Sequence, residues 1–229
     1  LSNEFINNLS DDATDETLFT TDGELIALTA IRNCYSVTCP SEIVNREYDK
    51  YFKKEASDGG KGNDAERLFR QIFNSKHLST FEHISFTFTI EHVSRALLAQ
   101  LTRHRIGFSF SVKGQRYVKY GSNDKTGGFR YVIPDTIKDN EKVIPDNEDG
   151  AYALDYYRYV MAYVQNAYNK LREAGVPAED ARMVLPQAAT CDIVMTANLR
   201  ALLDFYSKRQ YGKGAQWEIA DLAEEIRKA

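Results

Sequence analysis

The sequence predicts an α+β fold in a single domain that spans residues 1–229, and three observations support this. Segments with helical spacing of apolar residues outnumber strand-like segments, and helices separate the strands along the chain. One segment, 84–91, alternates strictly between apolar and polar residues, as a half-buried strand does. A chain of 229 residues can bury one sizeable core, and it shows neither internal repeats nor an interdomain linker.

Before that strand, apolar residues at helical spacing predict helices at 24–35, 41–54 and 65–73. Asp22 is the candidate N-cap of the first of these helices. The glycines and charges of residues 57–64 predict a flexible loop between the second and third helices.

After the strand, residues 93–102 predict a helix that leads into three basic residues, Arg103, His104 and Arg105. Gln100, Arg103 and His104 share one helical face because they stand at i, i+3 and i+4. A Ser-rich segment, 107–114, follows and is expected to be a flexible loop. Helix end, basic cluster and loop together indicate an anion-binding pocket, although a solvated basic face is the general alternative.

The rest of the chain is mainly helical in pattern. Residues 121–149 are polar and predict mostly loop around a short strand at 129–133. A long helix is expected at 152–173, where Gly175 and Pro177 mark its end. The remaining elements expected are a helix at 178–184, a strand at 192–196, and helices at 199–209 and 216–228.

Composition excludes several classes of protein. The chain is 43% hydrophobic and 27% charged, with a net charge of −4, which argues against a general nucleic-acid binder. Stacking of the tyrosines in 156–159 on bases is therefore less favoured than a structural role. No apolar run approaches membrane-spanning length. Three cysteines make an odd number for disulfide pairing, which favours reduced thiols and a cytoplasmic location.

A metal site is not expected. His77, Glu82 and His83 do not match the His-Glu-x-x-His spacing of zinc enzymes. A serine nucleophile in a Gly-x-Ser-x-Gly turn is also absent from the sequence.

Six sequence blocks together resemble the flavin-dependent thymidylate synthases. Arg103-His104-Arg105 is followed after a short segment by Gln115-Arg116-Tyr117, and the other blocks begin at His77, Ala181, Thr196 and Ala215. The blocks span residues 77–218 in the order found in that family. The resemblance implies a central, mostly antiparallel sheet flanked by helices, and a homotetramer with active sites between subunits.

The resemblance also implies an activity: reductive methylation of dUMP to dTMP, with methylenetetrahydrofolate as carbon donor and NADPH as reductant, through bound FAD. The flavin does the redox chemistry and the protein supplies positioning and electrostatics. The small-molecule partners expected are therefore dUMP and folate, with no nucleic acid and no membrane.

Residue by residue, the resemblance assigns three sets of side chains. Those that would bind the flavin are His77, Ser79, Arg103, His104, Arg105, Ile106, Asn198 and Arg200. Those that would bind the nucleotide are Gln100, Arg103, Gly114, Gln115, Arg116, Arg182 and Arg209. Arg209 and Gln100 would also act in catalysis by polarising the uracil ring.

Structural roles are open for several of these residues. Asn198 is placed to cap the helix at 199–209, and Arg209 to complement the dipole at the end of that helix. Asp180 is the neighbouring carboxylate that could pair with Arg182.

One motif position departs from the resembled family. Gly114 stands where a serine is usual, and the segment between Arg105 and Arg116 is one residue longer than the common form. Glycine could bring backbone N–H groups close to an anion and so replace the serine. Two alternatives follow from the departure: a flavin-dependent methylase of another uridine nucleotide, or an inactive nucleotide-binding homologue.

Overall fold

The computed structural model of the chain describes residues 21–138, 142–145 and 151–229. These residues fall into two compact units. The first is the chain up to Ser85 together with Asn198–Arg200, and the second is Phe86–Ala197 together with Ala201–Ala229. Each unit is described by itself below, and the single domain stays a prediction.

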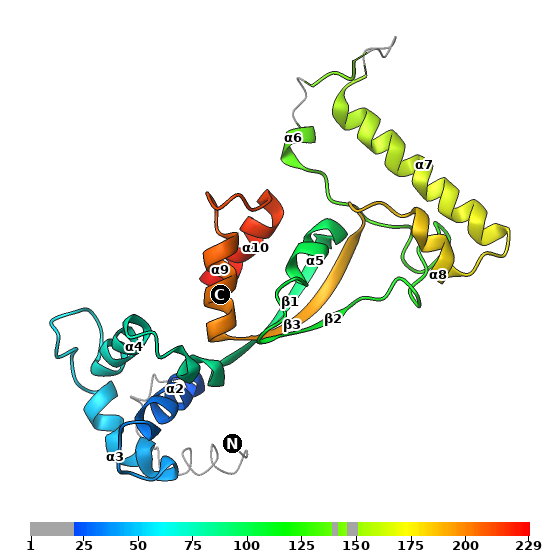
Figure 1. Cartoon of the computed structure of the whole chain (residues 1–229). Helices are drawn as coiled ribbons and strands as arrows, with labels where there is room; N and C mark the ends of the chain where they lie inside the picture. Colours follow the sequence, from blue (N-terminus) through cyan, green and yellow to red (C-terminus); the bar gives the residue numbers. More distant parts are fainter. Residues whose placement is uncertain (1–20, 139–141, 146–150) are drawn as a thin grey trace. The chain divides into compact units, whose positions relative to one another are not determined.

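The first unit is helical. Its elements, at the blue and cyan end of the chain in Figure 1, are α2 (Asp22–Asn33), α3 (Pro40–Phe52), α4 (Asp64–Asn74) and the 3-10 helix η1 (Leu78–His83). They bury one core in which Leu28, Ile31 and Ile43 are fully inaccessible to solvent. The three predicted helices are confirmed within a few residues.

Side chains cap the helices of this unit. The N-cap of α2 is Thr21, which forms a capping box with Glu24, and Asp22 is the first helical residue instead of the predicted cap. Asn63 caps α4 by accepting a hydrogen bond from the Glu66 backbone N–H at 3.0 Å.

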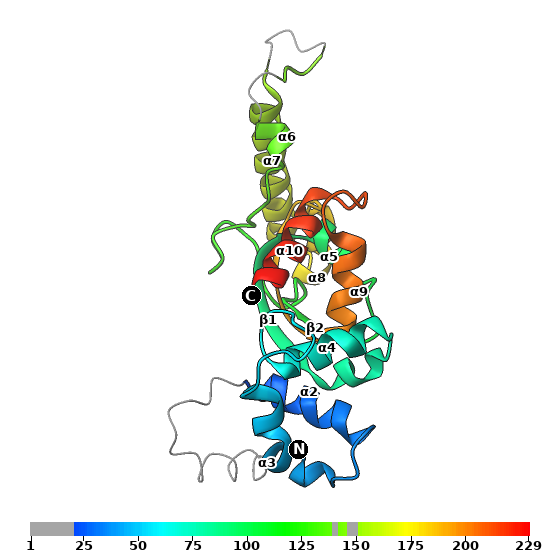
Figure 2. The same cartoon turned by 90° about the vertical axis from the view of Figure 1, so that its left-hand side faces the viewer.

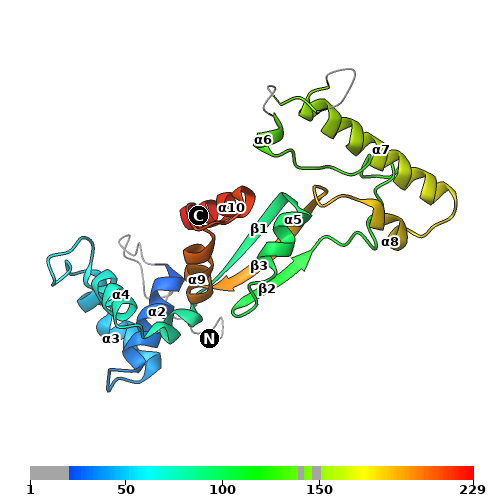
Figure 3. The same cartoon turned by 45° about the horizontal axis from the view of Figure 1, so that its top comes forward.

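The second unit contains a three-stranded sheet. Its strands are β1 (Ser85–Ser94), β2 (Phe108–Val112) and β3 (Thr190–Asn198), in the order β1-β3-β2 (Figure 3). β2 and β3 pair antiparallel from Phe108 opposite Ala197 to Val112 opposite Ile193. The Thr87 hydroxyl meets that of Thr196, whereas the His92 N–H donates to Asp192, so β1 also runs opposite to β3. The predicted α+β class with an antiparallel sheet is confirmed.

Helices cover one face of this sheet. α5 (Arg95–Leu101) lies over the strands in Figures 1 and 3, and α9 (Leu199–Arg209) and α10 (Trp217–Lys228) complete the layer (Figure 2). Alternate residues of β3 point into the core between sheet and helices, among them Cys191, Ile193 and Met195. The predicted core position of Cys191 is confirmed.

A second, smaller core forms around the long helix α7 (Ala153–Glu173), near α8 (Ala178–Ala181) and the 3-10 helix η2 (Arg182–Val184). Tyr168 of α7 is fully buried. Its hydroxyl accepts a hydrogen bond from the Tyr120 N–H, and Gln165 binds the backbone at both Tyr120 and Phe129. The segment from 120 to 129 is therefore fastened to α7. A one-turn helix, α6 (Asp135–Lys138), was not predicted.

Three sequence expectations were wrong in this unit. The segment expected as a flexible loop, 107–114, contains β2. The strand expected at 129–133 is reduced to a single bridge between Tyr131 and Ala189. The helix expected from Val93 begins at Arg95, because β1 continues to Ser94, the N-cap of α5.

The junction between β1 and α5 depends on a buried carboxyl group. Glu218 of α10 accepts hydrogen bonds from the Ser94 backbone N–H at 2.7 Å and from the Ser94 hydroxyl at 2.5 Å. The same hydroxyl oxygen accepts from the Leu97 N–H at 3.0 Å. Ser94 and Glu218 are both buried. These contacts fix where the helix begins and hence where the basic cluster follows.

We predict that Ser94→Ala lowers the free energy of unfolding by about 1–3 kcal/mol, because it leaves a buried carboxyl oxygen unpaired and removes the helix cap. Urea unfolding followed by circular dichroism measures the change. Ser207→Ala removes an exposed hydroxyl that donates to the Asp204 backbone oxygen. This control should shift stability by less than about 0.5 kcal/mol. Equal losses in the two variants would contradict the prediction.

Candidate functional site

Two elements of the second unit bring Arg209 against the end of α5. Arg209 is the last residue of α9, and its Nε donates to His104 Nε2 at 3.0 Å. Its Nη2 also approaches the backbone oxygen of Gln100 at 3.5 Å. The two contacts use two of the five N–H groups of a guanidinium and leave the others for a ligand. The structure thus brings Arg209 and Gln100, both expected to bind the nucleotide, together with His104, which was expected to bind the flavin.

His104 is held in its neutral form. Burial lowers the pKa of His104, and the nearby cations Arg209 and Lys208 lower it further. The ring packs edge-on against Phe205, with the ring centres 5.0 Å apart. Since Nε2 accepts a hydrogen bond from Arg209, the ring proton of the neutral form lies on Nδ1. Only Arg103 and Arg105 of the basic cluster are therefore cationic at neutral pH.

The residues on either side of His104 face solvent. Arg103, Arg105 and Ile106 are exposed, and Ile106 has 94% of its surface accessible. Neither arginine makes an ion pair with a carboxylate in the described part of the chain. Two unpaired guanidinium groups beside an exposed apolar side chain suit a ligand that carries both phosphate and a ring system.

A second group of cations gathers on Glu179, the second residue of α8. Arg116 Nε lies 2.6 Å from a Glu179 carboxylate oxygen, and Arg182 Nε donates to the Glu179 backbone oxygen at 2.9 Å. Asp180, the neighbour expected to pair with Arg182, is not its partner. Arg116 and Glu179 border an open cavity of about 410 Å³, together with Tyr117, Lys119, Arg172, Pro177 and Ala178. A carboxylate held by arginine occupies the kind of position that a phosphate would take.

Gly114 and Gln115 lie between these two groups in sequence. Gly114 does not have the left-handed backbone that only glycine adopts readily. A Cβ atom there would meet its nearest neighbour, Tyr117, at 3.7 Å, an ordinary contact. Gln115 is buried, and its side-chain nitrogen has no hydrogen-bond partner among the described residues.

The other predicted flavin residues lie in the first unit. His77 precedes η1, and its Nδ1 lies 2.8 Å from the Tyr35 hydroxyl. Arg200 pairs with Glu82 of η1 at 2.5 Å. Within the same unit, the Leu199 N–H donates to the Ile84 oxygen at 2.8 Å. Ser79 is exposed on η1, and Asn198 ends β3.

Sequence reasoning missed three partners of predicted residues: Tyr35, Glu82 and Glu179. Glu82 stands within the block that begins at His77, which was the one signal available for it. Nothing in the local sequence marks Tyr35 or Glu179. His83 is exposed.

The described residues show neither a metal-binding cluster nor a membrane-spanning helix. Within residues 21–138, 142–145 and 151–229, His, Cys, Asp and Glu side chains form no group of three that could hold a metal ion. Over the same residues, every helix is too short or too polar to cross a bilayer.

Comparison with known proteins places the chain in a family. The family model described as thymidylate synthase complementing protein matches residues 17–229, so the chain belongs to this family. A flavin-dependent thymidylate synthase from Geobacter sulfurreducens is 38% identical over 90% of this chain and 77% of the relative. Another from Nitratidesulfovibrio vulgaris is 44% identical over 85% and 72% of the two chains.

Solved structures agree with the family assignment. The UMP/dUMP methylase PolB from Streptomyces cacaoi, bound with 5-Br dUMP, superposes with a TM-score of 0.61 at 25% identity. The match covers 90% of this chain and 83% of the methylase.

We predict that His104 titrates below the value of about 6.5 found for an unperturbed histidine. Arg209→Gln should raise the pKa of His104, because it removes a neighbouring cation. Proton NMR of the ring Cε1–H signals measures the pKa of His104 in the unmodified protein and in Arg209→Gln. The chain has four histidines, and His104→Gln identifies the signal that belongs to this one.

The lowered pKa of His104 makes the folded protein less stable as the pH falls. Because the folded pKa of His104 is lowered, the unfolded state takes up a proton first as pH falls, and folding loses stability below about pH 6.5. His104→Gln, which stays neutral, should remove this part of the acid destabilisation. A signal that titrates above the unperturbed value would contradict the neutral assignment.

Proposed function

We propose that this protein is a flavin-dependent thymidylate synthase that converts dUMP to dTMP, with methylenetetrahydrofolate as carbon donor, NADPH as reductant and FAD as cofactor. The observation that carries the proposal is the pair of relatives named flavin-dependent thymidylate synthase, matched over most of both chains. The arrangement of arginines described above supports it.

Each unit carries residues that we propose for the flavin. Arg103 and Arg105, without carboxylate partners in the described chain, suit the pyrophosphate of FAD, and exposed Ile106 suits an apolar ring. Neutral His104 adds a planar surface beside them. In the first unit His77, Ser79, Asn198 and Arg200 would contribute polar contacts. When bound, the flavin supplies the electron transfer that amino-acid side chains cannot perform.

The nucleotide phosphate would take the position that Glu179 now fills. Arg116 pairs with the carboxylate of that residue and Arg182 donates to its backbone oxygen, so a phosphate there would replace the carboxylate as the partner of Arg116 and add a charged partner for Arg182. The unpartnered amide nitrogen of Gln115 would gain an oxygen acceptor, since leaving it buried and unpaired costs about 1–3 kcal/mol. Gly114, Gln100 and Arg103 would complete the nucleotide contacts.

Arg209 would act on the uracil ring. Its contacts with His104 and the Gln100 backbone orient the guanidinium and leave N–H groups free to donate to a ring carbonyl oxygen. Donors fixed in advance stabilise negative charge as it develops on that oxygen during reaction at the neighbouring ring carbons. Because His104 is neutral, it adds no second positive charge that would compete for the same oxygen.

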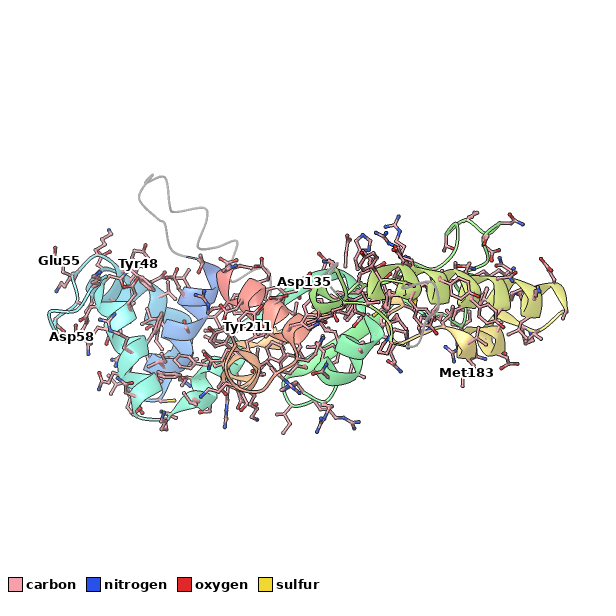
Figure 4. All side chains as sticks on the ribbon, turned by 90° about the horizontal axis from the view of Figure 1, so that it is seen from above. Tyr48, Glu55, Asp58, Asp135, Met183 and Tyr211 are labelled. Atoms are coloured by element: carbon pink, nitrogen blue, oxygen red, sulfur yellow. The ribbon has the colours of Figure 1, made fainter. Side chains whose placement is uncertain are left out.

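The assembly proposed is a cytoplasmic homotetramer with active sites between subunits. Large apolar side chains stay exposed on elements of the candidate site, including Tyr117 and Met183, which is labelled in Figure 4 and is 81% accessible. Tyr156, Tyr159 and Tyr163 are also exposed, at helical spacing along α7. Exposed aromatic and methionine side chains are enriched at subunit interfaces. The exposed cysteines Cys34 and Cys39 are free thiols, as a reducing compartment allows.

We predict that replacing Arg103 and Arg105 together by alanine removes the yellow colour of the purified protein without unfolding it. Both side chains are exposed, so the fold does not depend on them. Each lost charged contact should weaken flavin binding about ten- to a hundredfold. Flavin absorbance per protein, with circular dichroism as the folding check, measures the effect.

The matched control is Arg158→Ala with Arg227→Ala, because these are also exposed arginines of the second unit. It should keep its flavin. Full flavin occupancy in the folded Arg103/Arg105 variant would refute the cofactor assignment.

We predict that the unmodified protein forms dTMP in a single turnover when it is reduced and loaded with folate and dUMP. Gly114→Ser should change the rate or the dUMP affinity by about tenfold or less, because the backbone at Gly114 accepts a Cβ without strain.

Arg182→Ala should weaken dUMP binding about ten- to a hundredfold.

Two results of the single-turnover assay would contradict the proposed activity. Product from Gly114→Ser alone would identify the natural chain as an inactive homologue. Methylation of UMP in place of dUMP would identify a methylase of another uridine nucleotide.

A further inference from the structure

A second basic cavity lies in the second unit, formed by residues that the proposed function does not use. Its volume is about 290 Å³. The ends of β1 and β3, the residue after β2 and the segment from 120 to 130 enclose it. The lining residues are His92, Lys113, Tyr120, Lys125, Thr126, Gly128, Arg130, Thr190 and Asp192.

The charges in this cavity do not balance. Asp192 is the one carboxylate of the lining, and its oxygen lies 3.0 Å from Lys113 Nζ. Lys125 and Arg130 make no ion pair with any carboxylate among the described residues. Arg130 Nη1 instead contacts His92 Nε2 at 3.5 Å. Two positive charges therefore remain after Lys113 is paired, and they face a space large enough for a small anion.

The walls of the cavity are fixed by hydrogen bonds before any ligand arrives. Gln165 of α7 holds the segment at Tyr120 and at Phe129, with distances of 2.8 Å to each. Thr126 donates to the Lys119 oxygen at 2.8 Å. Gly128 has a φ of 106°, which residues other than glycine rarely adopt, and a Cβ there would come within 2.7 Å of Gln165 Oε1, so glycine is favoured at this position. Lys125 and Arg130 are thus presented by a constrained segment and not by a loose loop.

A backbone conformation of higher energy also borders the cavity. His92, near the end of β1, has a φ of 59°, a left-handed value uncommon for a residue other than glycine. Its N–H donates to Asp192 at 3.1 Å, which holds it in this conformation. The bend turns the His92 side chain to contact Arg130. Conformations of this kind concentrate at ligand sites, where the surrounding structure maintains them.

We propose that this cavity is an anion site that binds a phosphoryl group, either inorganic phosphate or the terminal phosphate of a nucleotide. The Arg130 guanidinium offers paired donors to two phosphate oxygens, and the Lys125 ammonium offers a point charge. Lys113 stays with Asp192 and completes the positive rim. The site is independent of Arg116 and Arg182, the residues proposed for the substrate phosphate, because none of its lining residues belongs to that group.

Protection of Lys125 from acetylation tests the proposal at the level of one residue. The FAD-loaded protein, in a phosphate-free buffer, is treated with an amine-acetylating reagent while inorganic phosphate is titrated against chloride at equal ionic strength. Peptide mass spectrometry gives the acetylation rate of Lys125 and, as internal reference, of Lys228, an exposed lysine of α10. A second arm replaces phosphate by AMP and a third by adenosine.

Phosphate should slow acetylation of Lys125 saturably, about tenfold when its concentration reaches ten times the dissociation constant, and leave Lys228 unchanged. Arg130→Gln should raise the phosphate concentration that gives half-maximal protection of Lys125 about ten- to a hundredfold. The matched control Arg158→Gln, an exposed arginine of α7, and the substrate-site variant Arg182→Ala should both keep full protection.

The outcomes separate this site from the proposed enzyme activity. Protection by AMP at lower concentration than by phosphate, with none by adenosine, identifies the nucleotide as the source of the phosphoryl group. Protection by phosphate alone identifies the free ion. Equal rates in phosphate and chloride, or protection that survives Arg130→Gln and disappears in Arg182→Ala, would overturn the proposal, whether or not the protein forms dTMP.

Discussion

A buried contact between Ser94 and Glu218 sets the position of the basic cluster. Glu218 receives both the backbone N–H and the hydroxyl of Ser94, and the same hydroxyl caps α5. Because α5 has only seven residues, a change in its start is passed directly to Arg103, His104 and Arg105. The contact between α10 and the start of α5 thereby determines the positions of the Arg103 and Arg105 cations and of neutral His104. Neither Ser94 nor Glu218 belongs to the candidate site.

The arginines of the candidate site differ in the groups that they contact. Arg209 is oriented by His104, whose pKa is lowered by burial and then by the charge of Arg209, so the pair carries one positive charge in total. Arg116 pairs with the Glu179 carboxylate, which a phosphate could displace, and Arg182 donates to the backbone oxygen of the same residue. Arg103 and Arg105 have no carboxylate partner in the described chain and stay available. The availability of each arginine for a ligand thus depends on the groups around it and not on the arginine side chain itself.

Local pattern predicted much of this fold, and long-range contact supplied the rest. The helices around Leu28 and Tyr168 follow from apolar spacing alone. β2 was missed because serines suggested a loop, although Phe108, Phe110 and Val112 alternate with Ser109 and Ser111 as a strand does. The pairing of His104 with Arg209 joins residues 105 positions apart, and that of Arg116 with Glu179 joins residues 63 apart. Motif resemblance could propose such residues, but no spacing rule could give their partners.

The unbroken ladder between β2 and β3 has a consequence for how relatives of this chain can diverge. Every residue from Phe108 to Val112 faces a partner, and the Lys113 N–H continues the ladder to Asp192. An extra residue inside such a strand would turn the following side chains to the opposite face. A length change between Arg105 and Arg116 can therefore be absorbed only beyond the strand's ends. At the exit of β2, it would alter the reach of Arg116 while Arg103, which we propose for both flavin and nucleotide, keeps its place. Relatives could therefore differ in the contact proposed between Arg116 and the nucleotide phosphate and keep the contacts proposed for the flavin.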